Sequence, residues 1–287
     1  MIVIVGASGA VGTPTIRHLA RMGASVRALT SNPRSAERLT GLGVSETVIG
    51  DFRSGADVAR ALSGAESVLL VSPRFTEDEA EIGIRAVEAA KAEGVGHFVY
   101  SSAFHPQMSR MDHHATKLRI EEAVIESGLA FTIVQPSMFM QNVRVEWREV
   151  VENGVYPRPY SPHRKMSVID TEDLGEAIAR VLTDPALRGG TYELCSGDSP
   201  THAEMAAIFS EVLGREVTAQ KRSLEDWRSW AAERGWANWS IDAYARMCGH
   251  YDAHGYPGDN ALALRAVLGR EPTGYRAFAA RFAAEMG

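Results

Sequence analysis

Short apolar runs alternate with amphipathic segments through the first half of the chain. Residues 2–5, Ile-Val-Ile-Val, are β-branched throughout, which is typical of a strand buried on both faces. Segments with apolar residues at helical spacing follow, most clearly at 77–93 and 112–127. Further strand-like runs occur at 25–30, 47–49, 67–71, 97–100 and 130–135. The alternation predicts an α/β fold, a doubly wound parallel sheet of the Rossmann type with right-handed connections.

Beyond Pro136 the pattern is less regular. It predicts a helix at 138–153, an exposed Pro- and Arg-rich loop at 156–163, a short strand at 166–169, a helix at 170–182 and a strand at 190–194. From residue 201 onward it predicts mostly helices, with one strand near Val217. We expect residues 1–155, joined by 166–195, to form the Rossmann lobe. Residues 196–287 would form a smaller, mostly helical lobe over the carboxyl edge of the sheet, where a substrate would bind.

The first predicted strand leads directly into a glycine-rich turn, and a predicted helix follows. In a dinucleotide fold the first glycine permits the tight turn, the second lets a phosphate approach the backbone, and the third lets the helix pack closely. The start of the helix would then present free N–H groups to the phosphates. The alternative is a glycine-rich turn without a ligand. We expect a pyrophosphate site made by Gly6, Ser8, Gly9, Ala10, Val11 and Gly12.

The end of the second predicted strand bears on the choice between NAD and NADP. An acidic residue there binds the ribose of NAD, whereas arginine accommodates the 2′-phosphate of NADP. No acid occurs between residues 27 and 36, and Arg34 is available. Hydrogen-bonding side chains are supplied by Thr30, Ser31 and Asn32. This favours NADP, with NAD as the alternative, although Arg34 would also suit a solvent-exposed helix start.

Two further strand ends are expected to contact the cofactor. Asp51 follows the third predicted strand, where it would accept a hydrogen bond from the adenine amine while Phe52 covers the ring. An equally good interpretation is that Asp51 caps the next helix. The fourth strand ends in Val71, Ser72 and Pro73, which we place at the same edge of the sheet.

Composition narrows the class of protein. The 287 residues are 45% hydrophobic, enough for a full core, and a net charge of −6 argues against a general nucleic-acid or membrane-surface binder. No stretch approaches the ~18 apolar residues that cross a bilayer. Cys195 and Cys248 form no metal-ligand spacing, so we expect reduced thiols, no metal and a cytoplasmic location. Because the first predicted strand begins at residue 2, we expect no signal peptide.

These features together resemble the NmrA-like group of atypical short-chain dehydrogenases/reductases. The resemblance rests on the glycine turn, on Thr-Ser-Asn-Pro-Arg at 30–34, on Gly50-Asp51 and on Ser-Ser-Ala at 101–103. It rests also on His-His-Ala-Thr-Lys at 113–117 and Gln-Pro-Ser-Met-Phe-Met-Gln-Asn at 135–142. Residues 1–185 fit well and the tail fits poorly. Relatives include quinone reductases, dye and isoflavone-type reductases, and redox-sensing regulators that bind the cofactor without turnover.

One departure from the wider superfamily concerns catalysis. Its members use Tyr-x-x-x-Lys, whereas here His113 stands four residues before Lys117. Residues four apart share a helix face, so His113 would point where the tyrosine does, and His114 would point elsewhere. The resemblance implies that Lys117 binds the nicotinamide ribose; His113 is a candidate proton donor. Both could instead be surface helix residues. By resemblance Ser101 or Ser102 would bind the substrate carbonyl oxygen, unless they only satisfy backbone groups at the strand end.

The resemblance also implies a pocket beside the nicotinamide, with Pro136, Met138 and Phe139 on one wall. Trp227 and Trp230, like Trp236 and Trp239, are three residues apart and so would share helix faces. Such aromatic residues are more often core than substrate site. Candidates for substrate contact are His105, Phe139, Tyr160, His163, Met166, Trp227 and Trp230.

We therefore expect an NADPH-dependent reductase that acts on a small aromatic carbonyl or quinone. The alternative is a non-catalytic redox sensor that binds NAD(P) and regulates a protein partner. The missing tyrosine favours the sensor, and the aromatic tail counts against it. A nucleotide-sugar epimerase or dehydratase is disfavoured, because those enzymes rely on that tyrosine. The expected partner is a small molecule, with no nucleic acid or membrane, and a homodimer is left open.

Overall fold

A seven-stranded parallel sheet forms the centre of the computed structural model, which describes residues 1–286. Its strands are β1 (Ile2–Val5), β2 (Val26–Thr30), β3 (Glu46–Ile49), β4 (Ser67–Leu70), β5 (His97–Ser101), β6 (Phe131–Pro136) and β10 (Thr191–Leu194). They lie in the order β10-β6-β5-β4-β1-β2-β3, and every pairing is parallel. The order reverses between β1 and β4, which is where doubly wound sheets bind ligands. The predicted Rossmann-type sheet is confirmed.

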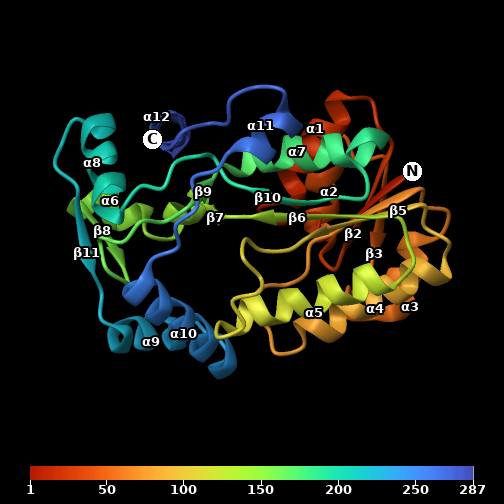
Figure 1. Ribbon diagram of the computed structural model, residues 1–287, viewed down its shortest axis with the longest axis horizontal. Coiled ribbons are helices and arrows are strands. Elements are labelled where there is room, and N and C mark those ends of the chain that lie inside the picture. Colours follow the sequence, from red (N-terminus) through yellow and green to blue (C-terminus); the bar gives the residue numbers. More distant parts are fainter. Residues whose placement is uncertain (287) are drawn as a thin grey trace.

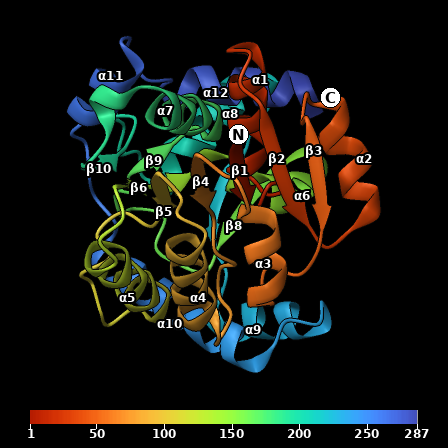
Figure 2. The same ribbon diagram turned by 90° about the vertical axis from the view of Figure 1, so that its right-hand side faces the viewer.

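Helices cover both faces of the sheet (Figure 1). One face carries α1 (Gly12–Arg21), α2 (Pro33–Gly41), α7 (Thr171–Thr183) and α11 (Leu262–Leu268). The other carries α3 (Gly55–Leu62), α4 (Glu79–Ala92) and α5 (Asp112–Glu126), which lie side by side in Figure 2. All four residues of β1 are buried, which explains its unbroken β-branched sequence.

A second group of elements lies beyond the carboxyl edge of the sheet (Figure 1). Its core is rich in aromatic side chains, including Trp147, Phe209, Tyr275 and Phe282. Two short two-stranded parallel sheets complete it, β8 with β11 and β7 with β9. The elements are β7 (Met138–Phe139), η1 (Met140–Val145), α6 (Trp147–Asn153), β8 (Val155–Arg158), β9 (Val168–Ile169), α8 (His202–Leu213), β11 (Thr218–Lys221), α9 (Leu224–Glu233), α10 (Asn238–His254) and α12 (Tyr275–Met286), with η2 (Pro185–Leu187) preceding β10.

Three sequence-based predictions for this part of the chain were wrong. The predicted exposed loop at 156–163 begins with the buried strand β8, because the guanidinium of Arg158 pairs with the carboxylate of Glu146 at 3.1 Å and so can be buried. The predicted helix at 138–153 is instead a strand, a 3₁₀ helix and a short α-helix. Trp236 precedes α10, so it shares no helix with Trp239.

The division into lobes at residue 195 stays a prediction. Some residues before position 195 pack with the second group of elements, and some residues after it pack with the Rossmann sheet. β8 pairs with β11, which places residues 155–158 with the second group of elements. α11 packs against α7 and β10, so part of the tail returns to the Rossmann sheet. No helix within residues 1–286 is both long enough and apolar enough to cross a membrane.

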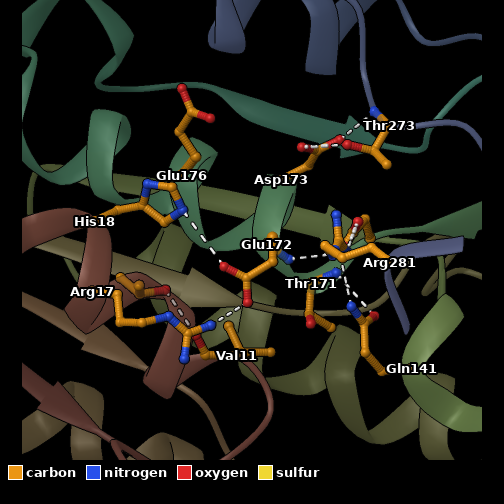
Figure 3. A network of polar contacts seen from close by, with 12 residues as sticks. Val11, Arg17, His18, Gln141, Thr171, Glu172, Asp173, Glu176, Thr273 and Arg281 are labelled. Carbon is orange, nitrogen blue, oxygen red and sulfur yellow. Dashed lines mark hydrogen bonds and ion pairs between the residues drawn. The ribbon is translucent and has the colours of Figure 1, made fainter. Parts of the chain in front are cut away.

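The glycine-turn helix α1 is fastened to α7 (Figure 3). A Cβ at Gly175 would lie 2.7 Å from the Cβ of Pro14, so only glycine permits this close approach. Arg17 of α1 forms an ion pair with Glu172 of α7. The buried Asp170 caps α7 and also pairs with Arg281 of α12 at 2.5 Å. These contacts hold the start of α1 in place relative to both groups of elements.

Candidate functional site

The glycine turn leaves space for an anion at its surface. Gly6 has φ +88°, and a Cβ there would lie 2.6 Å from the carbonyl oxygen of Val71. A Cβ at Gly12 would lie 2.5 Å from the carbonyl oxygen of Gly6, whereas one at Gly9 would meet only that oxygen, at 3.3 Å. Gly9 is exposed together with its neighbours, and no side chain caps the start of α1. Backbone packing therefore explains why Gly6 and Gly12 are glycines. Gly9 instead borders the uncapped start of α1, which fits a pyrophosphate.

The adenosine end of the site contains an arginine that sequence reasoning missed. Arg38 of α2 donates from Nη2 to the carbonyl oxygen of Ser8 in the glycine turn at 3.2 Å. Arg34 lies one helical turn earlier on the same helix and is exposed. The i, i+4 spacing of the two arginines was the available signal. Because residues four apart share a helix face, Arg34 is expected on the same face of α2 as Arg38.

The other predicted adenosine residues have local roles. The side chain of Asn32 caps α2 by accepting from the amide of Arg34 at 2.9 Å. Thr30 Oγ1 accepts from the amide of Asn32 at 3.3 Å, and Ser31 is exposed. These contacts shape the β2–α2 turn and leave the two arginines to supply positive charge beside it.

Asp51 does not cap α3. Ser54 does so, by accepting from the amide of Asp57, while Asp51 accepts from the amide of Arg53 at 2.9 Å. The capping alternative for Asp51 is therefore wrong. The guanidinium of Arg53 lies 5.0 Å from the ring centroid of Phe52. Both Asp51 and Phe52 lie just past the carboxyl end of β3, at the ligand-facing edge of the sheet.

Lys117 is buried in a polar cluster at the carboxyl end of β4. Its Nζ lies 2.8 Å from Ser72 Oγ and 2.9 Å from Glu79 Oε1. Ser72 in turn donates to the same Glu79 oxygen at 2.9 Å. Of the three N–H groups of the ammonium, two face Ser72 and Glu79, and no other acceptor among the described residues bonds to the third. Nζ also lies 5.5 Å from the ring centroid of Tyr100. Val71 and Pro73 flank Ser72 and are partly buried.

Glu79 was not predicted as a site residue. It is fully buried at the first position of α4, and in the sequence it looks like an ordinary acid at a helix start. Burial raises the pKa of its carboxyl group, but Lys117 and His113 outweigh that effect and lower the pKa to about 2. The group is therefore a carboxylate at neutral pH.

His113 occupies the same cluster. Its Nδ1 lies 3.5 Å from Glu79 Oε2, and its ring stacks on Phe75 with centroids 4.5 Å apart. Burial lowers the pKa of His113, and the neighbouring carboxylate only partly opposes this. His114 points away, with Nδ1 at 3.1 Å from the carbonyl oxygen of His105. The helix spacing thus placed His113 and Lys117 on one face, as predicted.

The two serines at the carboxyl end of β5 are buried. Ser101 is 3% exposed and Ser102 is 6% exposed. Ser102 lies beside Glu121, whose carboxylate accepts from Gln135 Nε2 at 2.9 and 3.0 Å. Burial raises the pKa of Glu121. A role for either serine toward a substrate stays a prediction.

Residues of the predicted nicotinamide wall come together around β7. Pro136 ends β6, and Met138 and Phe139 form β7, both partly buried. The hydroxyl of Tyr160 contacts Met138 Sδ at 3.8 Å, which brings a predicted pocket residue to this wall. Met166 is fully buried in the same aromatic core. His163 is exposed on a turn.

Trp227 and Trp230 are placed differently from each other. Trp227 is 5% exposed in the small core between α9 and α10, and it stacks on Tyr244 with centroids 4.4 Å apart. Tyr244 in turn meets Phe75 edge-on at 5.4 Å. Trp230 lies between the guanidiniums of Arg222 and Arg234. Packing therefore favours the core interpretation for Trp227, which reaches His113 only through Tyr244 and Phe75.

Two hollows are found elsewhere on the surface. One of about 290 Å³ is lined by Phe104, His105, Glu193 and the segment 258–263. His105 Nε2 lies 3.6 Å from Glu193 Oε1 there. The other, of about 510 Å³, lies near Glu204, Glu211 and Tyr275. The larger hollow contains none of the predicted site residues, and the smaller one contains only His105. We assign the chemistry to the cluster around Lys117, because Lys117, His113 and Ser72, all predicted, meet there around Glu79.

Comparisons with known proteins identify the family of the chain. Residues 1–255 match the family described as NmrA-like. The chain is 31% identical over 226 residues to the NAD(P)H azoreductase of Xenophilus azovorans, covering 78% of each chain. It is 27% identical to quinone oxidoreductase 2 of Escherichia coli, covering 79% of each. A crystal structure of an Escherichia coli NADPH-dependent quinone oxidoreductase with NADPH is 25% identical, with a TM-score of 0.85 over 98% of this chain and 99% of that one.

Proposed function

Because this chain belongs to the NmrA-like family, we propose that it is an NADPH-dependent reductase whose acceptor is a small aromatic carbonyl, quinone or azo compound. It is similar over most of its length to oxidoreductases named for NAD(P)H, azo and quinone substrates. One observation carries the proposal, namely that buried Lys117 keeps one N–H free at the same sheet edge as the open glycine turn. A surface lysine would have no such pair of fixed partners.

Different residues would bind different parts of the cofactor. The glycine turn and the start of α1 would hold the pyrophosphate, and Arg34 with Arg38 would hold the 2′-phosphate. The remaining N–H of Lys117 would donate to the ribose next to the nicotinamide. Pro136, Met138 and Phe139 would lie along the nicotinamide. When bound, NADPH supplies the hydride, and the protein supplies orientation and exclusion of water.

The acceptor would be held beside the aromatic side chains that close this end of the site. Phe75 and Tyr160 present flat or amphipathic surfaces next to His113 and Met138 respectively. Negative charge that develops on an acceptor oxygen or nitrogen needs a nearby donor. His113 is our first candidate for that donor, through Nε2 of its imidazolium form, with Ser101, Ser102 and His105 as the alternatives.

Cofactor titration followed by turnover tests the proposal. NADPH and NADH are titrated into the protein, and the absorbance of NADPH is then followed on addition of a naphthoquinone, an azo dye and an aromatic ketone. We expect NADPH to bind more tightly than NADH and to be oxidised by at least one acceptor. Tight binding without turnover by any acceptor would contradict a reductase and favour a cofactor-binding regulator. Absence of binding would contradict both.

A further inference from the structure

We propose that Glu79 is a positioning residue that holds the ammonium of Lys117 and the imidazole of His113 in fixed orientations at the nicotinamide end of the site. The proposal rests on the proposed function for its effect on the cofactor, but its geometric basis stands in the unliganded protein. Glu79 is fully buried on α4, whereas Lys117 and His113 lie on α5. A carboxylate is rarely buried without a partner, and here each oxygen faces one of the two groups.

The contact with Lys117 sets the direction of the free N–H. Glu79 Oε1 and Ser72 Oγ lie 2.9 and 2.8 Å from Nζ, and they also bond to each other. The ammonium of Lys117, the hydroxyl of Ser72 and the carboxylate of Glu79 therefore each bond to the other two. They come from three elements, since Ser72 follows β4, Glu79 lies on α4 and Lys117 lies on α5. Two fixed bonds leave the third N–H with a single direction, which a flexible four-carbon side chain alone would not provide.

The contact with His113 sets the position of the ring proton. Nδ1 faces the second carboxylate oxygen at 3.5 Å, a contact longer than a hydrogen bond, and neither atom has another hydrogen-bond partner among the described residues. The proposal therefore predicts that the neutral ring carries its proton on Nδ1, beside the carboxylate, and that Nε2 donates only when the ring is an imidazolium. Phe75 holds the ring from the other side, and Ser240 of α10 donates to the carbonyl oxygen of Phe75 at 2.6 Å. The ring therefore has little freedom to turn.

Besides Glu79, the charged or titratable groups that act on His113 are Lys117 and His114 on α5 and Arg74 on the loop before α4. Two tyrosines lie one contact further away, Tyr100 of β5 beside Lys117 and Tyr244 of α10 against Phe75. Lys117 and Arg74 disfavour the imidazolium, and Glu79 favours it. Glu79 is thus the group whose removal would change the state of the ring most clearly.

Glu79→Gln preserves the shape of the side chain and gives a sharp prediction. The amide oxygen of the substituted side chain must serve Lys117 and Ser72, because both donate to that position. The amide NH₂ would then face His113, so the ring must accept at Nδ1 and move its proton to Nε2. Loss of the carboxylate would also lower the pKa of His113 further, because a favourable charge is removed.

Nitrogen NMR of the unliganded protein with ¹⁵N-labelled histidine reads both effects, with His113→Phe used to assign the signal. We expect an Nδ1–H ring in the native protein, an Nε2–H ring in Glu79→Gln, and no change in Glu81→Gln. Glu81 is the matched control, since it pairs with Arg119 between the same two helices but is exposed. A native ring protonated at Nε2 would overturn the proposal without any variant, even if Glu79→Gln fails to fold.

Cofactor affinity supplies the second readout. Glu79→Gln should weaken NADPH binding about tenfold. The double variant Glu79→Gln/Lys117→Met should bind NADPH almost as well as Lys117→Met alone, because the two residues act through one contact. Fully additive losses would overturn the link to Lys117. If the ring tautomer changes as expected while no variant affects NADPH binding, the positioning of His113 stands and the contact of Lys117 with the cofactor is overturned. Failure of the native protein to bind NADPH would instead contradict the proposed function and leave the tautomer result intact.

Discussion

The Nζ of Lys117 lies 2.9 Å from the carboxylate of Glu79, and their side chains are 5% and 0% exposed. A buried ion pair of this kind is costly to break, because removing one partner leaves the other charged group without solvent. The geometry excludes the interpretation of Lys117 as a surface helix residue. It also joins α4 to α5 at the edge of the sheet where the cofactor is proposed to bind.

Gly9→Asp should abolish NADPH binding without unfolding the protein. A Cβ at Gly9 would meet one backbone oxygen, at 3.3 Å, which requires a shift of only a few tenths of an ångström, and residues 8–10 are exposed, so we expect the fold to tolerate the substitution while the carboxylate repels the pyrophosphate. We expect a melting temperature within about 2 °C of the native protein and no detectable binding by titration. Gly12→Ala is the contrasting variant, because its methyl group would lie 2.5 Å from Gly6 O and should destabilise the fold. Unchanged NADPH affinity in Gly9→Asp would refute the phosphate site.

Arg34→Ala and Arg38→Ala should reduce NADPH affinity more than NADH affinity. The two guanidiniums lie one turn apart on α2, and Arg38 already reaches Ser8 in the glycine turn. Loss of a charge-assisted bond to the 2′-phosphate should weaken NADPH about tenfold per arginine, with NADH affected less than about twofold. Equal losses for both cofactors, measured by fluorescence titration, would show that neither arginine distinguishes them.

The Rossmann-type sheet was predictable because its inner strands β1, β2, β4, β5 and β6 are almost entirely buried. Runs such as residues 2–5 have only one good structural solution, and their order determines the sheet. The helix spacing likewise sufficed to place His113 and Lys117 together. Glu79 could not be predicted from the motifs. An acid at the start of a helix is common, and the pairing of Glu79 with Lys117 depends on α4 and α5 lying side by side.

The second group of elements was harder to predict for a different reason. Pro157 and Arg158 suggest an exposed loop, yet β8 is buried, because Glu146 neutralises the guanidinium from an adjacent element. Burial in this region depends on long-range pairs rather than on local periodicity. Trp227 could not be assigned from the sequence for the same reason. Neither its spacing nor its size distinguishes a core side chain from one that lines a substrate pocket.

His113→Phe should lower turnover while leaving NADPH affinity within about twofold. Phenylalanine preserves the stacking on Phe75 but removes both ring nitrogens. If His113 stabilises or protonates the acceptor, kcat should fall about 100-fold. His254→Ala, at an exposed histidine on α10, is the control and should retain full activity. Native turnover in His113→Phe would remove His113 from the mechanism and leave the serines and His105 as candidates.

The stability that Glu79 contributes should depend on pH in a defined direction. Its pKa is about 2 in the folded protein, below the ordinary value of 4.5, so the folded state holds the carboxylate when the unfolded chain has taken up a proton. The contribution is therefore complete above about pH 5 and is lost as pH falls from 4.5 toward 2. Urea unfolding of the native protein and Glu79→Gln measures it as a difference in the free energy of unfolding.

That difference should be at most about 3 kcal/mol at about pH 6 and should shrink steadily below about pH 4.5, since a protonated glutamic acid and glutamine are nearly equivalent to Lys117. Glu81→Gln, which removes an exposed carboxylate paired with Arg119, should differ from the native protein by less than about 1 kcal/mol at every pH. A Glu79→Gln difference that stays constant from about pH 6 to about pH 3 would mean that the carboxylate carries no charge-dependent stability. The ion pair with Lys117 would then fail to explain why Glu79 is buried.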